Sequence, residues 1–163
     1  MTFSTCDLCD AHKGDDTGSF RVVPGGVLHS YGGAVRFAGP VATVKCYEDN
    51  SLVKAAVESA GDGRVLVVDG AGSLRRALLG GNLAAAAAKN GWAGLVIDGA
   101  VRDLAELAAA AVGILARGHV PLPTDRRGQG LAGGAVQIAG VWVRPGDWLY
   151  ADADGVVIMA AAA

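Results

Sequence analysis

Residues 80–107, GGNLAAAAAKNGWAGLVIDGAVRDLAEL, decide the fold of this chain. The alanine-rich run after Asn82 predicts a helix, and Asn90-Gly91 is typical of a helix C-terminus. The short apolar run at 94–97, GLVI, predicts a strand buried on both faces. A second helix is expected to start after Arg102-Asp103 and to run to residue 111. Alternation of helices with buried strands predicts an α/β domain with a parallel sheet.

Two parts of this stretch can carry chemistry. Gly80-Gly81-Asn82 begins a helix, where free N–H groups and the positive end of the helix dipole attract anions. Arg102 can bind a carboxylate through two hydrogen bonds, and Asp103 can hold a hard cation. The glycine pair is equally consistent with a kink, and the Arg-Asp pair with a helix cap or a surface ion pair. We expect the two parts to meet in one site.

An internal similarity extends this prediction to the preceding strand. Residues 64–68, RVLVV, predict a buried strand, and VVDGA at 67–71 resembles VIDGA at 96–100. In a right-handed βαβ unit both junctions fall at the same edge of a parallel sheet, where ligands bind in open α/β folds. The similarity therefore predicts that five residues line one crevice: Asp69, Gly70, Asp98, Arg102 and Asp103.

The rest of the chain predicts β-rich flanks around this central βαβ layer, in one domain spanning residues 1–163. We expect helices at 4–12 and 51–60 and from about Ser73, where Gly80-Gly81 would interrupt or restart the helix. Strands are expected at 20–23, 41–47, 112–116, 136–139, 141–143, 148–151 and 156–159. Proline and glycine make 117–134 a long exposed loop.

Composition limits the classes of function. Of the 163 residues, 52% are apolar and 18% are charged, and the formal net charge is −2. No basic run suits nucleic-acid binding, and no apolar run reaches the ~20 residues of a membrane span. The low charge suggests further burial in an oligomer. Three cysteines without a signal peptide suggest a cytoplasmic protein, and Cys6-x-x-Cys9 is either a zinc half-site or two small residues on a helix.

The common nucleotide and hydrolase motifs are missing or incomplete. Gly70-Ala-Gly72 follows a strand, but Arg75 stands where a dinucleotide fingerprint needs its third glycine. The sequence contains neither GxxxxGK[ST] nor GxSxG. His12, His29 and His119 are scattered, and we expect surface or packing roles for them.

The sequence resembles the family of regulator of ribonuclease activity A (RraA), which includes class II 4-hydroxy-4-methyl-2-oxoglutarate aldolases. The likeness covers nearly the whole chain, with TCDLCDAH, VLVVDGAGSLRRALLGGNLA, NGWAGLVIDGAVRDLAEL and VRPGDWLYADADGVVI among the matching segments. The aldolase motif of the family is a glycine, twenty residues, Arg-Asp, two residues and an acid. Gly81, Arg102, Asp103 and Glu106 fit it without a gap.

The resemblance implies a swivelling β/β/α fold and a homotrimer with sites between protomers. It implies a carbon–carbon lyase that releases pyruvate from 4-hydroxy-4-methyl-2-oxoglutarate or a similar 4-hydroxy-2-oxo acid, with oxaloacetate decarboxylation as a second reaction through the same enolate. The alternative is a non-catalytic inhibitor of ribonuclease E. A methyltransferase of menaquinone synthesis, an older label in the family, finds no glycine-rich cofactor motif here.

The resemblance also assigns roles. Asp103 would hold a divalent cation, usually Mg²⁺ with Mn²⁺ as the alternative, and Glu106 would orient metal-bound water. Arg102 would bind a carboxylate or carbonyl oxygen of the 2-oxo acid. The pyruvyl carboxylate would accept hydrogen bonds from the backbone N–H groups of Gly81, Asn82 and Leu83.

Overall fold

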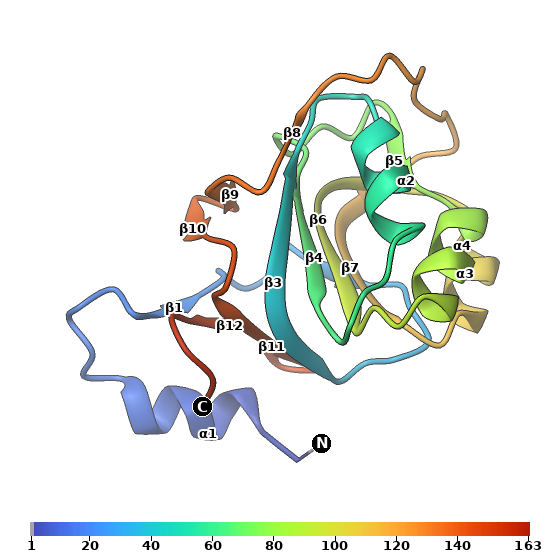
Figure 1. Ribbon diagram of the computed structural model, residues 1–163. Helices are drawn as coiled ribbons and strands as arrows, with labels where there is room; N and C mark the ends of the chain where they lie inside the picture. The colour runs from blue at the N-terminus through green and yellow to red at the C-terminus, as the bar shows by residue number, and fades with distance from the viewer. Residues whose placement is uncertain (1) are drawn as a thin grey trace.

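The structure is a computed structural model that describes residues 2–163, and Figure 1 shows a mixed sheet with a group of helices on one side and the N-terminal helix apart from them. The strand order of the large sheet is β1-β12-β11-β3-β4-β6-β7-β2, with β5 added to β6 and β8 added to β3. The elements in chain order are α1 (Thr5–His12), β1 (Phe20–Val22), β2 (His29–Ser30), β3 (Phe37–Lys45), α2 (Ser51–Val57), β4 (Val65–Asp69), β5 (Ala77–Leu79), α3 (Gly81–Lys89), β6 (Gly94–Val101), α4 (Leu104–Ala109), β7 (Gly113–His119), β8 (Leu131–Ala132), β9 (Val136–Ile138), β10 (Val141–Val143), β11 (Trp148–Asp152) and β12 (Gly155–Met159).

The centre of the sheet is parallel, as the sequence predicts. Strands β3, β4, β6 and β7 run in parallel, and every residue of β4 and β6 is buried. Helices α2, α3 and α4 cover one face of this centre (Figure 1), where Leu66, Leu95 and Ile114 pack in one cluster with side chains of the helices. Burial on both faces explains why these strands are continuous apolar runs.

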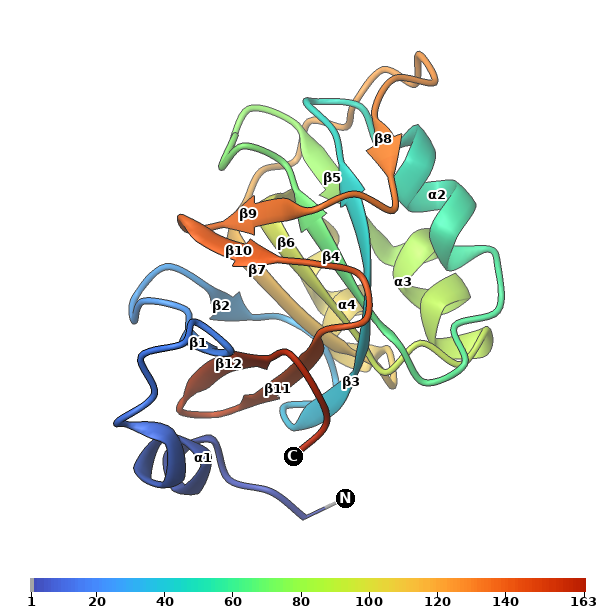
Figure 2. The same cartoon turned by 60° about the vertical axis from the view of Figure 1, so that its left-hand side comes forward.

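Strand β3 joins two layers because its halves pair with different partners. Residues 37–40 pair antiparallel with β11, whereas residues 41–45 pair in parallel with β4. The β9–β10 hairpin lies across the face of the parallel strands opposite to the helices, as Figure 2 shows. Its Val136 and Ile138 are buried in one cluster with Val65 and Val67. The molecule therefore has two β layers and one helical layer.

The helix predicted to start near Ser73 is wrong. Residues 77–79 form β5, and Ala77, Leu78 and Leu79 are all buried. A surface helix leaves part of its circumference in water, so three successive buried residues suit a strand covered on both sides. Helix α3 begins at Gly81, and β6 continues past the predicted 94–97 to Val101.

Helix α1 packs at the end of the molecule where β11 and β12 lie, and its N-cap is Ser4, whose hydroxyl accepts a hydrogen bond from the Asp7 amide. Cys6 and Cys9 lie on this helix, whereas Cys46 is buried in the helix-covered core. None of the helices described within residues 2–163 has the length and apolar character needed to cross a membrane.

Candidate active site

The two predicted parts of the site meet because the strands that lead into them are neighbours. Strand β5 pairs in parallel with the last residues of β6, with Leu79 opposite Val101. The Arg102 amide then donates to the Leu79 carbonyl oxygen at 2.9 Å. The chain leaves β5 into Gly80-Gly81 and leaves β6 into Arg102-Asp103, so both junctions open at one edge of the sheet.

Asp103 joins the start of α3 to the start of α4. Its Oδ2 accepts a hydrogen bond from the Gly81 amide at 2.9 Å, so its carboxylate lies at the positive end of α3. Asp103 is the N-cap residue of α4, although its side chain forms no capping hydrogen bond to this helix, and its backbone is left-handed at φ 60° and ψ 50°. Residues other than glycine rarely adopt this conformation, and such strain is concentrated at functional sites.

The two glycines allow this close approach. A Cβ atom on Gly80 would lie 2.7 Å from Asp103 Oδ2, and one on Gly81 would overlap the carboxylate of Glu106 and lie 2.8 Å from its Cβ. The side chain of Glu106 therefore packs directly over Gly81. This packing gives a physical reason for the spacing of glycine and acid in the motif.

The Gly81 amide already donates to Asp103, so its predicted hydrogen bond to the pyruvyl carboxylate has to be reconsidered. Helix geometry leaves the amides of Asn82 and Leu83 without an intrahelical acceptor. The N-cap residue Gly80 has no side chain that could accept them, and the Asp103 carboxylate at this helix end accepts the Gly81 amide instead. An anion at the start of α3 is therefore expected to bind two amides rather than the predicted three.

A depression of about 530 Å³ opens over these residues. A first wall consists of residues 80–83 with Arg102 and Asp103, and a second wall, from other parts of the chain, includes Asn50 and residues 123–126. Arg102 forms no ion pair within residues 2–163; its Nη1 lies 3.4 Å from the Pro121 carbonyl oxygen. Its positive charge remains available to a ligand.

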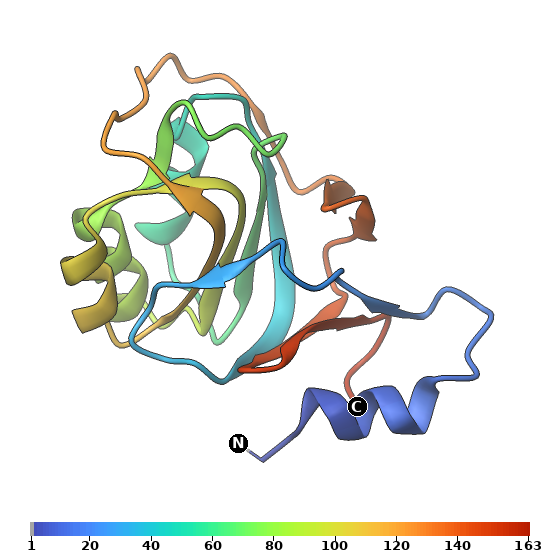
Figure 3. The ribbon, with the colours of Figure 1, turned by 180° about the vertical axis from the view of Figure 1, so that it is seen from behind.

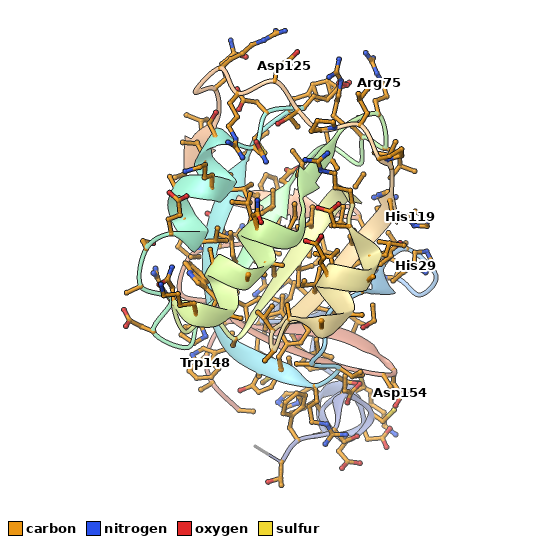
Figure 4. The ribbon with its side chains drawn as sticks, turned by 90° about the vertical axis from the view of Figure 1, so that its right-hand side faces the viewer. His29, Arg75, His119, Asp125, Trp148 and Asp154 are labelled. Atoms are coloured by element: carbon orange, nitrogen blue, oxygen red, sulfur yellow. The ribbon has the colours of Figure 1, made fainter. Side chains whose placement is uncertain are left out.

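The second wall belongs to the long segment between β7 and β8, which runs over the top of the molecule in Figure 3. The Ala77 amide donates to the Leu122 carbonyl oxygen, and the Thr124 hydroxyl donates to Asn50 Oδ1 at 2.8 Å. In Figure 4 Asp125 marks this segment at the upper end of the molecule, opposite Trp148 and Asp154. His29 and His119 lie at the edge formed by β2 and β7, and neither lines the depression.

Asp49 holds the same segment in place through hydrogen bonds. Its Oδ2 accepts the amides of Arg127 and Gln129 at 2.9 and 3.1 Å, and its Oδ1 accepts both the amide and the hydroxyl of Ser51. Burial alone would raise the pKa of Asp49, but the hydrogen bonds from Ser51 and from the two amides outweigh it and lower the pKa to about 2. Asp49 is therefore ionised at neutral pH, as four hydrogen-bond donors require.

The prediction that Asp69, Gly70 and Asp98 share the crevice of Arg102 and Asp103 is wrong. Asp69 and Asp98 line a separate depression. Asp98 pairs with Arg117 at 2.6 Å and accepts the Ala139 amide, while Asp69 accepts the Gln137 amide. These carboxylates hold the β9–β10 hairpin. The similarity of VVDGA and VIDGA thus marks two equivalent structural anchors, and β6 carries the chain four residues beyond Asp98 before Arg102.

Sequence reasoning missed Asn50, Thr124 and Arg126 in the depression, because they come from an irregular segment and a helix start. Proline and glycine density predicted the segment as a loop but gave no indication of where it lies. Among residues 2–163 no group of three or more His, Cys, Asp or Glu side chains is arranged to hold a metal ion. Asp103 is the acidic side chain at the junction of α3 and α4 that lines the depression.

Comparisons of the sequence and of the structure with known proteins agree on one family. The RraA-like model, described as Aldolase/RraA, matches residues 5–158. A protein of Albidiferax ferrireducens, provisionally named a 4-hydroxy-4-methyl-2-oxoglutarate aldolase, is 65% identical over 98% of this chain and 96% of its own length. The predicted swivelling β/β/α arrangement is confirmed by solved structures of similar fold.

Two of these structures have been given different functions. One is described as the RNA-processing inhibitor RraA from Thermus thermophilis, with a TM-score of 0.93 and 43% identity over 100% of this chain and 96% of that one. The other is described as an S-adenosylmethionine:2-dimethylmenaquinone methyltransferase from Geobacillus kaustophilus, with a TM-score of 0.90 and 42% identity over 98% and 96%. The shared sequence, the shared fold and the family model agree, and the chain belongs to the RraA-like family.

Proposed function

We propose that the protein is a divalent-metal-dependent lyase that cleaves 4-hydroxy-4-methyl-2-oxoglutarate, or a similar 4-hydroxy-2-oxo acid, to pyruvate. The observation that carries the proposal is the junction of α3 and α4, where two helix amides, the carboxylate of Asp103 and Arg102, which forms no ion pair within residues 2–163, line one depression. The name of the Albidiferax relative supports the same reaction. Oxaloacetate decarboxylation, which forms the same pyruvate enolate, is the expected second activity.

The donor set fits a hard cation such as Mg²⁺. Mg²⁺ keeps several water ligands and is often bound by only one or two carboxylates, so Asp103 with water is a sufficient set. Mn²⁺ suits the same oxygen ligands. When bound, such a cation supplies Lewis acidity that favours negative charge on the 2-oxo oxygen.

The residues of the chain have separate tasks in this proposal. The pyruvyl carboxylate accepts hydrogen bonds from the amides of Asn82 and Leu83 at the positive end of α3. Arg102 donates to the 2-oxo oxygen and stabilises the negative charge that develops there as the bond between C3 and C4 breaks. Glu106 orients the water that takes the proton of the 4-hydroxyl group, so that C4 leaves as the carbonyl carbon of the second product. The same water returns the proton to C3 of the enolate, which completes pyruvate.

Pyruvate release tests the proposal. We would couple it to lactate dehydrogenase, with oxaloacetate and with 4-hydroxy-4-methyl-2-oxoglutarate, in Mg²⁺ and in EDTA. Metal-dependent turnover of both acids is the expected result. Turnover of oxaloacetate alone would retain the enolate chemistry and reject the aldol substrate, while no turnover of either by folded protein with Mg²⁺ or Mn²⁺ would reject the lyase.

A second candidate function is inhibition of a ribonuclease, favoured by the similarity to the Thermus protein, which is described as an RNA-processing inhibitor. It requires a docking surface and no chemistry. Inhibition of ribonuclease E by metal-free protein, unchanged in an Arg102→Ala variant, is the result that would support it.

A further inference from the structure

Arg126 lies in the depression with an unneutralised charge. It lines the same depression as Arg102 and Asp103, on the second wall, and takes part in none of the ion pairs formed within residues 2–163. Its neighbours differ, because Asp125 Oδ2 lies 4.0 Å from Arg76 Nη1 and 3.8 Å from Arg127 Nη2. The nearest carboxylate in the sequence is thus directed toward other cations.

Asn50 holds Arg126 without neutralising it. Arg126 Nε donates to Asn50 Oδ1 at 3.2 Å, and the same oxygen accepts the Thr124 hydroxyl. Asn50 is 8% exposed, and its backbone N–H donates to Thr124 Oγ1. An arginine has five N–H donors in a planar fork, so a bond through Nε leaves both terminal nitrogens for a ligand. A carboxylate is the group that such a fork binds with two parallel hydrogen bonds.

We propose that Arg126, positioned by Asn50, binds a second carboxylate at the outer end of the substrate, so that the site selects 2-oxo dicarboxylic acids over acids with an uncharged outer end. The inference rests on the proposed function for the orientation of the ligand, with its pyruvyl carboxylate at the start of α3. It assigns the outer end to this same protomer, on the second wall of the depression whose first wall holds the pyruvyl subsite.

A matched pair of non-cleavable acids tests the assignment. 2-Oxoglutarate and 2-oxopentanoate have the same length and differ in the outer group, a carboxylate in the first and a methyl in the second. We would measure the binding of each to the full-length protein with Mg²⁺ by isothermal titration calorimetry. Hydrogen bonds to a charged group predict a preference of about 10- to 100-fold for 2-oxoglutarate.

Three variants separate charge from structure. Arg126→Gln is expected to reduce the preference to about threefold or less, while 2-oxopentanoate binds as before, because only the outer carboxylate loses its partner. Asn50→Asp keeps the accepting oxygen but places a competing carboxylate beside Arg126, so the preference is expected to fall about tenfold. Arg127→Gln removes an adjacent exposed cation outside the depression and is expected to leave the preference unchanged.

The outcomes distinguish this inference from the proposed reaction. A preference that persists in Arg126→Gln, or that falls equally in Arg127→Gln, would overturn the assignment, as would the absence of any preference in the unmodified protein. If the unmodified protein shows the preference and Arg126→Gln removes it, the subsite stands even where no pyruvate is released. If pyruvate is released but the preference is insensitive to Arg126, the reaction stands and the subsite falls.

Discussion

Asp103 combines three roles that two substitutions can separate. Its carboxylate carries charge into the depression, its Oδ2 accepts the Gly81 amide, and its backbone is left-handed. Asparagine tolerates this backbone and keeps an accepting oxygen, so Asp103→Asn removes only the charge. The lost interaction with the α3 dipole costs about 0.3–1 kcal/mol, which lowers Tm by about 1–4 °C in a domain of this size.

Asp103→Ala removes more. The lost hydrogen bond costs about 1 kcal/mol, and alanine pays about a further 1–2 kcal/mol for the left-handed backbone. The expected loss of about 2–3 kcal/mol lowers Tm by roughly 4–12 °C. The two variants should therefore differ clearly in stability but not in activity, because both lack the carboxylate proposed to hold the cation.

The assay compares Mg²⁺-stimulated pyruvate release with thermal unfolding for both variants. We expect each variant to lose about 100-fold or more of the stimulated rate, because a site with one carboxylate retains little affinity for Mg²⁺ without it. Asp125→Asn is the matched control, a carboxylate on the rim of the same depression that lies near two arginines. If Asp103→Asn keeps more than about a tenth of the Mg²⁺-stimulated rate, Asp103 is not the carboxylate that holds the cation.

Three further predictions follow from the packing and charge of other residues. Gly81→Ala forces the Glu106 side chain away, so we expect a loss of about 1–3 kcal/mol in urea unfolding, as for other overpacked sites, together with reduced activity. Asp49→Asn is expected to be less stable than the unmodified protein at neutral pH, and the difference should shrink as pH falls from about 5 to 2, because a lowered folded-state pKa stabilises only where the carboxylate is ionised. Asp98→Asn breaks an ion pair and should cost about 1–3 kcal/mol without changing the rate of pyruvate release, since Asp98 lies outside the candidate site.

Each of these three predictions has an outcome that would contradict it. Gly14→Ala adds a methyl group where, among residues 2–163, no atom beyond its chain neighbours lies within 4 Å, so it should be neutral, and equal losses in both glycine variants would contradict the packing argument. A stability difference for Asp49→Asn that is constant down to pH 2 would show that its carboxylate does not titrate as described. A large rate loss in folded Asp98→Asn would place Asp98 back in the active site.

The sequence was sufficient for the parallel centre and for the junction of α3 and α4, because both depend on local signals. Apolar runs, a helix start at glycine and the Arg-Asp pair all lie within 28 residues, and strand pairing brings them together. The helix wrongly predicted before Gly80 shows the limit of local sequence signals. Leu78 and Leu79 are compatible with a helix or a strand by composition, and they form a strand because the fold buries them on both sides.

What the sequence did not reveal depends on long-range polar contacts. Arg117 gave no signal of its pairing with Asp98, and Arg126 gave none of its contact with Asn50, 76 residues earlier. Irregular segments have no periodicity from which a direction can be inferred. The second wall of the site was therefore inaccessible to pattern reasoning, although its composition was correctly predicted as that of a loop.

The pairing of the first strand with the last has a consequence for the order of folding. Phe20 lies opposite Met159, and Ala38 lies opposite Tyr150, so the antiparallel layer joins segments more than 100 residues apart. During synthesis the parallel centre and the α3–α4 junction are complete in sequence well before residue 159 leaves the ribosome. The antiparallel layer can close only afterwards, because long loops must be ordered before these contacts form. A circular permutant that links the present termini and opens the chain within 121–130 would make this closure local, and we expect it to fold faster while losing the wall that carries Arg126.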